Sequence, residues 1–153
     1  MNEDQINNLI KTREGRRLLS IHSPSFFAVY YMGFDYVAHQ ERWINECVRL
    51  TRLAQERNSK EKLLLLAPRD HGKSYLSILY TVWRLCTDRN STILFVSATS
   101  GQAEKRLRLV KTFLESAVII EDWASDDLPP FRTPSTKWIN TQIYLNRDIE
   151  SID

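Results

Sequence analysis

The feature that most constrains the fold is a change of pattern between residues 62 and 86. Residues 62–67 (KLLLLA) form a short apolar run, whose length favours a strand over a helix. Because the run does not alternate between apolar and polar residues, we expect a strand that is buried on both faces. A polar loop follows. Residues from Gly72 to about Cys86 are expected to form a helix that is apolar on most sides, and such a helix belongs in an interior layer.

The chain then repeats this order. Residues 92–97 (TILFVS) are rich in β-branched and aromatic residues and predict a second buried strand, followed by a helix over about residues 101–116. Two successive strand–helix units predict a parallel sheet with right-handed crossovers. Residues 138–145 predict a further strand. We therefore expect an α/β fold in which helices flank a parallel sheet.

The region before the first strand is expected to be helical. Residues 1–25 form a polar N-terminal segment with a helix near Asn7–Leu19, ahead of a domain over residues 26–153. His39–Arg57 has the apolar spacing of an amphipathic helix. Four aromatic residues near the start of the domain are expected to pack in the core, with a platform for adenine as the alternative. These are Phe26, Phe27, Tyr30 and Tyr31.

Composition excludes several classes of protein. The net charge of +2 is too close to neutral to predict a nucleic-acid partner by itself. Cys47 and Cys86 lie in apolar patterns and are expected to be reduced core residues. The three histidines lack metal-ligand spacing, so no zinc site is expected. No apolar run approaches the ~20 residues needed to cross a membrane, and the polar N-terminus is not a signal peptide. We expect a soluble, intracellular protein.

The loop between the first strand and the buried helix carries a phosphate-binding motif. The usual pattern is G-x-x-x-x-G-K-[ST], and here it is APRDHGKS, with Ala67 in place of the first glycine. Unpaired N–H groups at a helix N-terminus favour an anion, and Gly72 lets the backbone approach it. Lys73 is expected to bind the β- and γ-phosphates of ATP, and Ser74 to bind Mg²⁺. The expected nucleotide-binding residues are Ala67, Pro68, Arg69, Asp70, His71, Gly72, Lys73 and Ser74.

Two residues of this loop are expected to act in catalysis. Arg69 lies four positions before Lys73 and is expected to reach the γ-phosphate as an arginine finger from the same chain. Lys73 and Arg69 are therefore the candidate catalytic residues. For Asp70 and His71, a simple place in an exposed loop is the alternative to a specific role.

These motifs resemble the ATPase domain of phage terminase large subunits. That family often has a phosphate loop without the first glycine and an arginine four positions before the lysine, as Arg69 and Lys73 are placed here. The segment ILFVSATSGQAEKRL from residue 93 resembles the family's second strand and the Ser-Ala-Thr segment after it. HQERW at 39–43 resembles a motif in which a glutamine contacts adenine, which makes Gln40 a further candidate. The resemblance covers about residues 26–150.

The resemblance implies a P-loop NTPase core that uses ATP and Mg²⁺ to move double-stranded DNA into a procapsid in the host cytoplasm. It also implies a portal protein and a small terminase subunit as partners, a ring of identical subunits, and an endonuclease domain in the full-length protein. The Walker B acid is expected beyond Asp153, so the core is incomplete at its C-terminus and hydrolysis is expected to be weak. Glu121 and Asp122 are a weaker candidate for that acid because they continue a helix.

Other functions stay open at this point. A helicase-like ATPase has the same core, and a small-molecule kinase or a non-catalytic nucleotide-binding fragment are further alternatives. Two basic groups are candidates for DNA contact, with a solvated helix face as the commoner explanation. They are Lys105, Arg106, Arg108 and Lys111 in the later helix, and Arg13, Arg16 and Arg17 near the N-terminus.

Overall fold

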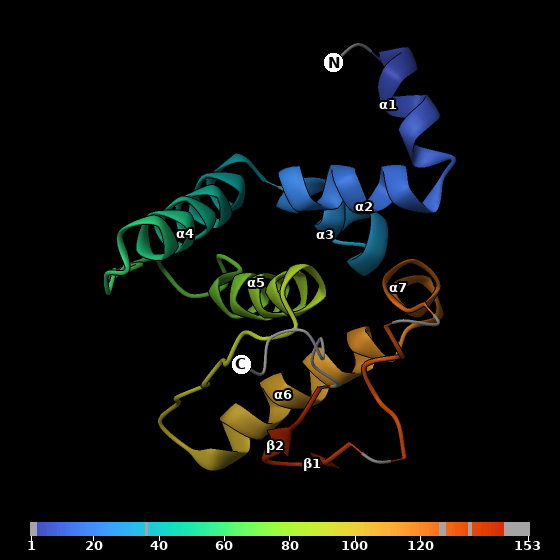
Figure 1. The fold of residues 1–153 in the computed structure, drawn as a ribbon. Helices are drawn as coiled ribbons and strands as arrows, with labels where there is room; N and C mark the ends of the chain where they lie inside the picture. The colour runs from blue at the N-terminus through green and yellow to red at the C-terminus, as the bar shows by residue number, and fades with distance from the viewer. Residues whose placement is uncertain (1–2, 36, 126–127, 135, 146–153) are drawn as a thin grey trace.

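The structure is a computed structural model that describes residues 3–35, 37–125, 128–134 and 136–145. This part of the chain forms seven helices and one short hairpin (Figure 1). The helices are α1 (Glu3–Ile10), α2 (Arg13–His22), α3 (Pro24–Met32), α4 (Ala38–Arg57), α5 (Lys73–Thr87), α6 (Ser100–Leu114) and α7 (Ala117–Trp123). The strands are β1 (Trp138–Ile139) and β2 (Gln142–Ile143).

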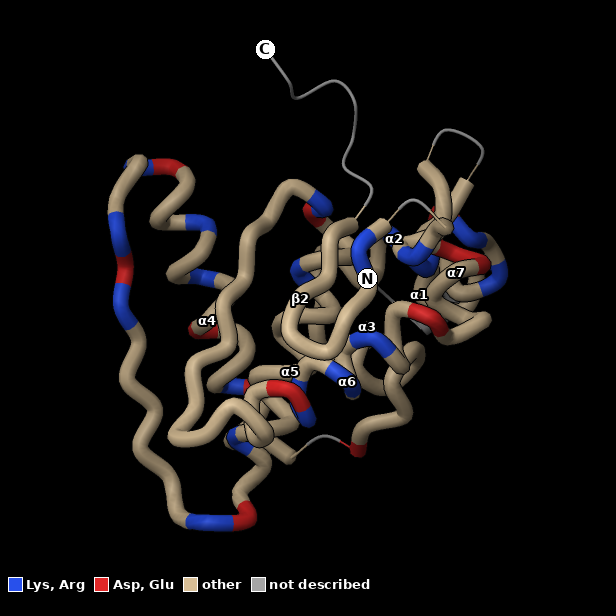
Figure 2. Tube along the Cα trace, turned by 90° about the horizontal axis from the view of Figure 1, so that it is seen from below, with Lys and Arg blue, Asp and Glu red and all other residues tan. Residues whose placement is uncertain are grey.

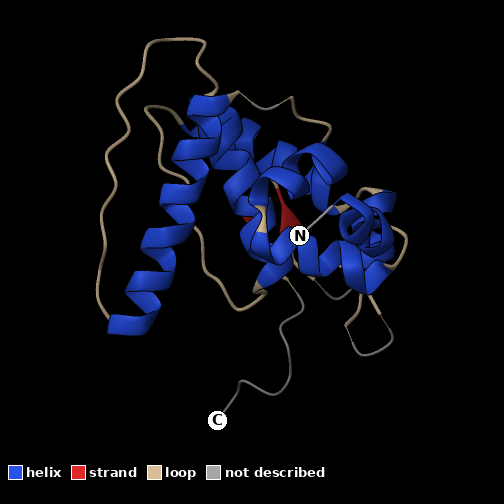
Figure 3. Cartoon of the chain, turned by 90° about the horizontal axis from the view of Figure 1, so that it is seen from above, coloured by secondary structure: helices blue, strands red, loops and turns tan. Residues whose placement is uncertain are grey.

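The predicted parallel sheet is wrong, and with it the α/β P-loop NTPase core. The described chain is all-α apart from one antiparallel hairpin, as Figure 3 shows. Residues 61–68 and 91–97 lie outside helices and strands, and no backbone hydrogen bond within the described residues joins them to a neighbouring strand. Leu64 and Leu66 are 79% and 84% exposed, so the leucine run is not buried on both faces. An apolar run favours extended chain, but it does not specify a strand to pair with.

The predicted strand over residues 138–145 is also wrong in its form. The chain turns back at Asn140 and Thr141, which makes two short strands from one expected strand. In this hairpin Trp138 faces Ile143 and Ile139 faces Gln142. A two-residue connection between antiparallel strands is the commonest way to close a hairpin.

The single helix predicted near Asn7–Leu19 is divided into α1 and α2. Thr12 caps α2, since its side chain accepts a hydrogen bond from the N–H of Gly15 at 3.1 Å. A Cβ at Gly15 would lie 2.1 Å from the carbonyl oxygen of Leu9. The close approach of α1 and α2 at this corner therefore requires glycine.

Helices, not a sheet, supply the core around α5. Eight residues of α5 are buried, including Leu79, Val82 and Trp83. This agrees with a helix that carries apolar residues around most of its circumference. It contacts α3, α4 and α6. The predicted amphipathic helix over His39–Arg57 is confirmed as α4, which buries Ile44 and Val48. No helix in the described part is both long enough and apolar enough to cross a membrane.

A buried ion pair joins α2 to α7. Arg16 donates two hydrogen bonds to the carboxylate of Asp122, at 2.7 and 2.5 Å, and Tyr31 of α3 donates a third at 2.6 Å. Burial alone would raise the pKa of Asp122, but the hydrogen bonds from Arg16 and Tyr31 hold that pKa below its usual range. Burial, together with the bond to Asp122, raises the pKa of Tyr31, which keeps its hydroxyl protonated.

Candidate functional site

The predicted phosphate loop leads into the N-terminus of α5. Gly72 precedes the helix in the left-handed region, with φ of 79°, and Asp70 adopts φ of 64°. The first hydrogen bond of the helix runs from the N–H of Leu76 to the carbonyl of Gly72. Within the described residues, the N–H groups of Lys73, Ser74 and Tyr75 have no hydrogen-bond partner. Such a turn of free donors carries partial positive charge and attracts anions.

Lys73 folds back over this loop. Its ammonium donates hydrogen bonds to the carbonyl oxygens of Ala67 and Pro68, six and five residues earlier in the chain. The contact links the two ends of the loop and keeps the ammonium beside it. If a phosphate group bound to the loop, its charged oxygens would be stronger acceptors for the ammonium than these two carbonyl oxygens.

Gln40 packs against Gly72 from the first turn of α4. A Cβ built on Gly72 would lie 2.2 Å from Nε2 of Gln40. The positive φ favours glycine at position 72, and a Cβ there would displace the terminal amide of Gln40 from the loop. The structure thus brings Gln40 to the loop, although the two segments are 32 residues apart in the sequence by their numbers.

Three aromatic rings lie in a row beside the loop. The rings of Trp43 and His39 are 4.8 Å apart on α4, and the rings of His39 and His71 are 5.8 Å apart. The Nε2 atom of His39 is 3.4 Å from the carbonyl oxygen of His71, and Nδ1 of His71 is 2.8 Å from the carbonyl oxygen of Arg69. Sequence analysis did not select His39 or Trp43 for the site. Their spacing of four residues on one helix face was the available signal.

The remaining loop residues face solvent. Arg69, Asp70 and Ser74 are exposed, and the described chain gives the side chain of Arg69 no hydrogen bond or ion pair. Ser74 lies in the first turn of α5 with its hydroxyl open to solvent. Among the described residues, no group of three or more His, Cys, Asp or Glu residues is placed to hold a metal ion. A Mg²⁺ ion fits here only when a phosphate chain and water supply most of its ligands beside Ser74.

Asp122 is excluded as a catalytic acid by its surroundings. AVIIED lies in a separate helix, α7, and Asp122 is 1% exposed with its carboxylate held by Arg16 and Tyr31. The segment was expected to end the preceding helix and pass into a loop, but it forms a helix of its own that includes both acids. Glu121 is exposed on the same helix.

Several basic residues proposed for DNA contact have structural roles instead. Arg13 donates to the carbonyl oxygens of Asp122 and Ala124, and Arg17 lies over the ring of Trp123 at 5.3 Å. Lys111 is buried and donates to the carbonyl oxygen of Ile139. Burial lowers the pKa of Lys111.

On α6, Lys105 and Arg108 stay exposed. No ion pair joins Glu104 to Arg108 within the described chain. Figure 2 shows Lys and Arg spread over several elements, with Asp and Glu between them. Among the described residues, this distribution gives no single basic stripe for a DNA backbone.

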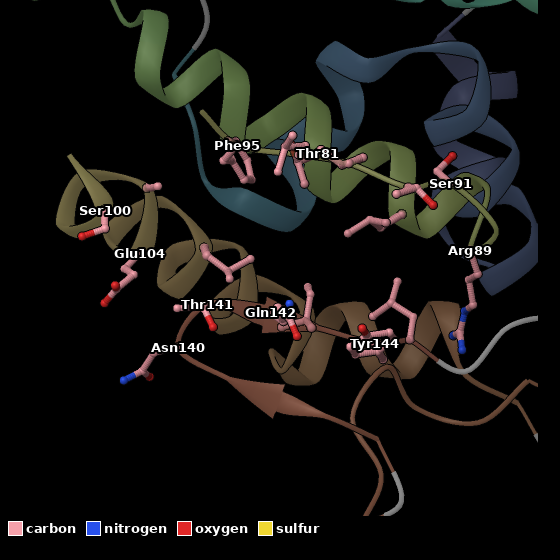
Figure 4. A pocket seen from close by; sticks show the side chains of 18 residues that line it. Thr81, Arg89, Ser91, Phe95, Ser100, Glu104, Asn140, Thr141, Gln142 and Tyr144 are labelled. Carbon is pink, nitrogen blue, oxygen red and sulfur yellow. The ribbon is translucent and has the colours of Figure 1, made fainter. Parts of the chain in front are cut away.

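A separate cavity lies between α5, α6 and the hairpin. Its volume is about 420 Å³, and it is bounded by α5, α6, residues 91–95 and the hairpin. None of residues 67–74 lines it, and neither does Gln40. Figure 4 shows its labelled side chains, from Thr81, Arg89, Ser91, Phe95, Ser100, Glu104, Asn140, Thr141, Gln142 and Tyr144. The cavity and the phosphate loop are therefore distinct features.

No family model, curated protein or solved structure matches this chain. The argument for a function therefore depends on the residues and on the geometry around the loop.

Proposed function

We propose that residues 67–74 bind the phosphates of ATP together with Mg²⁺, and that the chain is the nucleotide-binding part of a DNA-packaging ATPase of the terminase large-subunit type. The single observation that carries the proposal is the set of donors where the loop enters α5. Three N–H groups without a partner in the described chain and the ammonium of Lys73 belong to this short stretch. The proposal needs no parallel sheet, because the donors belong to the loop and the helix.

The charges of the loop support a polyphosphate ligand. A helix N-terminus provides a partial charge of about +0.5, and Lys73 and Arg69 each add a full positive charge against the one carboxylate of Asp70. Because Arg69 is exposed and has no hydrogen-bond partner in the described chain, its guanidinium is available to a terminal phosphate. A polyphosphate can contact Lys73 and Arg69 at once, which a single phosphate does less well.

The neighbouring α4 supports a nucleotide in preference to a bare polyphosphate. Gln40 supplies an amide at Gly72, and His39 and Trp43 supply rings next to the loop. An amide can form hydrogen bonds with the edge of a nucleobase, and aromatic rings can stack on its face. Contact between Gln40 and adenine, which the resemblance implies, is part of the proposal.

Hydrolysis by these residues alone is expected to be slow. Phosphoryl transfer requires an acid that holds Mg²⁺ and a group that positions water. Asp122, the buried acid of the described chain, is committed to Arg16 and Tyr31. We therefore propose tight binding with little turnover. The endonuclease, the portal protein, the small subunit and the ring assembly remain predictions from the resemblance.

Calorimetric titration with Mg²⁺–ATP tests the proposal. We expect Lys73→Ala to weaken binding by about ten- to a hundredfold, since hydrogen bonds to charged groups are worth about 1.5–3 kcal/mol. Lys60→Ala is the control, because it removes the charge of an exposed lysine that lies outside the phosphate loop and outside the helices. Equal affinity in the wild type and Lys73→Ala, or no binding in a folded wild type, would contradict the proposal. Turnover that rises when double-stranded DNA is added would separate a packaging motor from a small-molecule kinase.

A further inference from the structure

The phosphate loop separates its backbone acceptors from its backbone donors. Within the described residues, the N–H groups of residues 72–75 make no hydrogen bond. Most of the loop's carbonyl groups, in contrast, accept a hydrogen bond from a side chain or from the start of α5. These carbonyls belong to Ala67, Pro68, Arg69, His71 and Gly72. A turn whose carbonyls are held while successive N–H groups lack a partner is suited to an anion.

One of these carbonyls is held from outside the loop. The Nε2 atom of His39, in the first turn of α4, lies 3.4 Å from the carbonyl oxygen of His71. Since a carbonyl oxygen can only accept, Nε2 of His39 carries the proton and donates it. The four other carbonyls are bonded by Lys73, His71 and Leu76, which belong to the loop or to α5. Among the described residues, His39 is therefore the one donor to these carbonyls that comes from another helix.

The residue that His39 holds lies between two left-handed positions. His71 stands between Asp70 and Gly72, which have φ of 64° and 79°. A left-handed residue other than glycine is costly unless the surrounding structure holds it in place. The ring of His39 is itself braced, because it packs edge-on against the ring of Trp43 at 4.8 Å. The bond from His39 therefore limits how far the backbone on either side of His71 can relax.

We propose that His39 is a positioning residue of the phosphate loop, which holds the carbonyl of His71 and so keeps the N–H groups of residues 72–75 ready for a phosphate chain, whether or not a base is attached. The role of His39 rests on the proposed function, because it requires that the loop bind phosphate. It depends on the Nε2–H group and is separate from any stacking of the ring on a base. The loop should consequently bind inorganic tripolyphosphate with Mg²⁺, a ligand that has the phosphate chain of ATP and no base.

Three variants at position 39 test this role by calorimetric titration with Mg²⁺–tripolyphosphate and with Mg²⁺–ATP. His39→Phe keeps a ring beside Trp43 but loses the donor, so the affinity for both ligands should fall by about three- to tenfold, the range expected for one hydrogen bond. His39→Gln has no ring but places an amide N–H where Nε2 lies, and it should restore most of the affinity. His39→Asn is one carbon shorter and should resemble His39→Phe. His22→Phe is the matched control, because His22 is an exposed histidine at the end of α2 and makes no contact with the loop among the described residues.

Each variant should keep the helical circular dichroism of the wild type. Wild-type affinity in His39→Phe would overturn the role of His39 and leave the proposed function standing. A loss of affinity for Mg²⁺–ATP alone, or a wild type that binds ATP but not tripolyphosphate, would also overturn it, because the side chain would then act on the base. Equal losses in His39→Gln and His39→Phe would mean that the imidazole packs but does not position the loop by donating. If the folded wild type binds neither ligand, the proposed function fails, and the role of His39 fails with it.

Discussion

The ion pair between Arg16 and Asp122 makes a strong prediction about stability. Replacement of Arg16 by methionine keeps most of the side-chain volume and leaves the carboxylate of Asp122, which is 1% exposed, without its cation. Two hydrogen bonds of 2.5 and 2.7 Å are lost, and only the bond from Tyr31 remains on the side chain. Removing one partner of a buried pair costs about 3–5 kcal/mol. That is a large part of the about 5–15 kcal/mol by which a domain is stable.

Urea unfolding followed by circular dichroism measures this cost. The control is Arg49→Met, because Arg49 forms an ion pair with Glu46 at 2.7 Å in which the two side chains are 58% and 41% exposed. Exposed pairs contribute about 0–1 kcal/mol, so the control should change the free energy of unfolding far less. If Arg16→Met and Arg49→Met lower the free energy of unfolding by similar amounts, the buried pair does not join α2 to α7 as argued.

Three further predictions follow from the same structure. The pKa of Asp122 is lowered on folding, so its contribution to stability is full above the ordinary aspartate pKa of about 3.9 and is lost as pH falls through the lowered value. The urea midpoint of the wild type should therefore fall at acid pH. The midpoint of Asp122→Asn should fall less. Gly72→Ala should weaken ATP binding, because the new Cβ displaces the amide of Gln40 and strains the backbone of the loop. Gly33→Ala is the control: with a similar φ of 64° and no atom within 4 Å of the new Cβ, it should have a similar backbone cost of about 1 kcal/mol and leave calorimetric binding intact. Burial raises the pKa of both thiols, but Cys86 is buried and Cys47 is only half-buried. A thiol reagent should therefore label Cys47 first and Cys86 only on unfolding. Equal labelling rates of the two cysteines in the native protein would contradict the packing of α5.

The helices could be predicted from the sequence because their signals are local. Each of these helices is defined by a pattern within a single segment: an apolar stripe in α4, and apolar residues on most sides of α5. Both helices are present within a residue or two of the expected bounds. Gly33 ends α3 in the left-handed region, which is a common local signal for the end of a helix. The break at Thr12 was missed, because a threonine cap and a glycine three residues later also fit within one continuous helix.

The sheet was predicted wrongly because strand pairing is not local. KLLLLA and TILFVS have strand-like compositions, but strand pairing depends on residues elsewhere in the chain. The apolar surface of α5 packs against other helices and not against a sheet. The same limit applies to the candidate site. The loop residues were found from their motif, and Gln40 from a resemblance. The contacts of His39 with His71 and of Arg16 with Asp122 join distant segments and leave no pattern in the sequence.

The most direct test of the proposed nucleotide site is a titration of ¹⁵N-labelled protein with Mg²⁺–ATP, followed through the backbone amide resonances. The account predicts that the largest shifts belong to Gly72, Lys73, Ser74 and Tyr75, whose N–H groups surround the start of α5, and that Lys73→Ala strongly reduces them. Shifts confined to the cavity beside α6, or no shifts in a folded protein at saturating nucleotide, would contradict the claim that this loop binds phosphate.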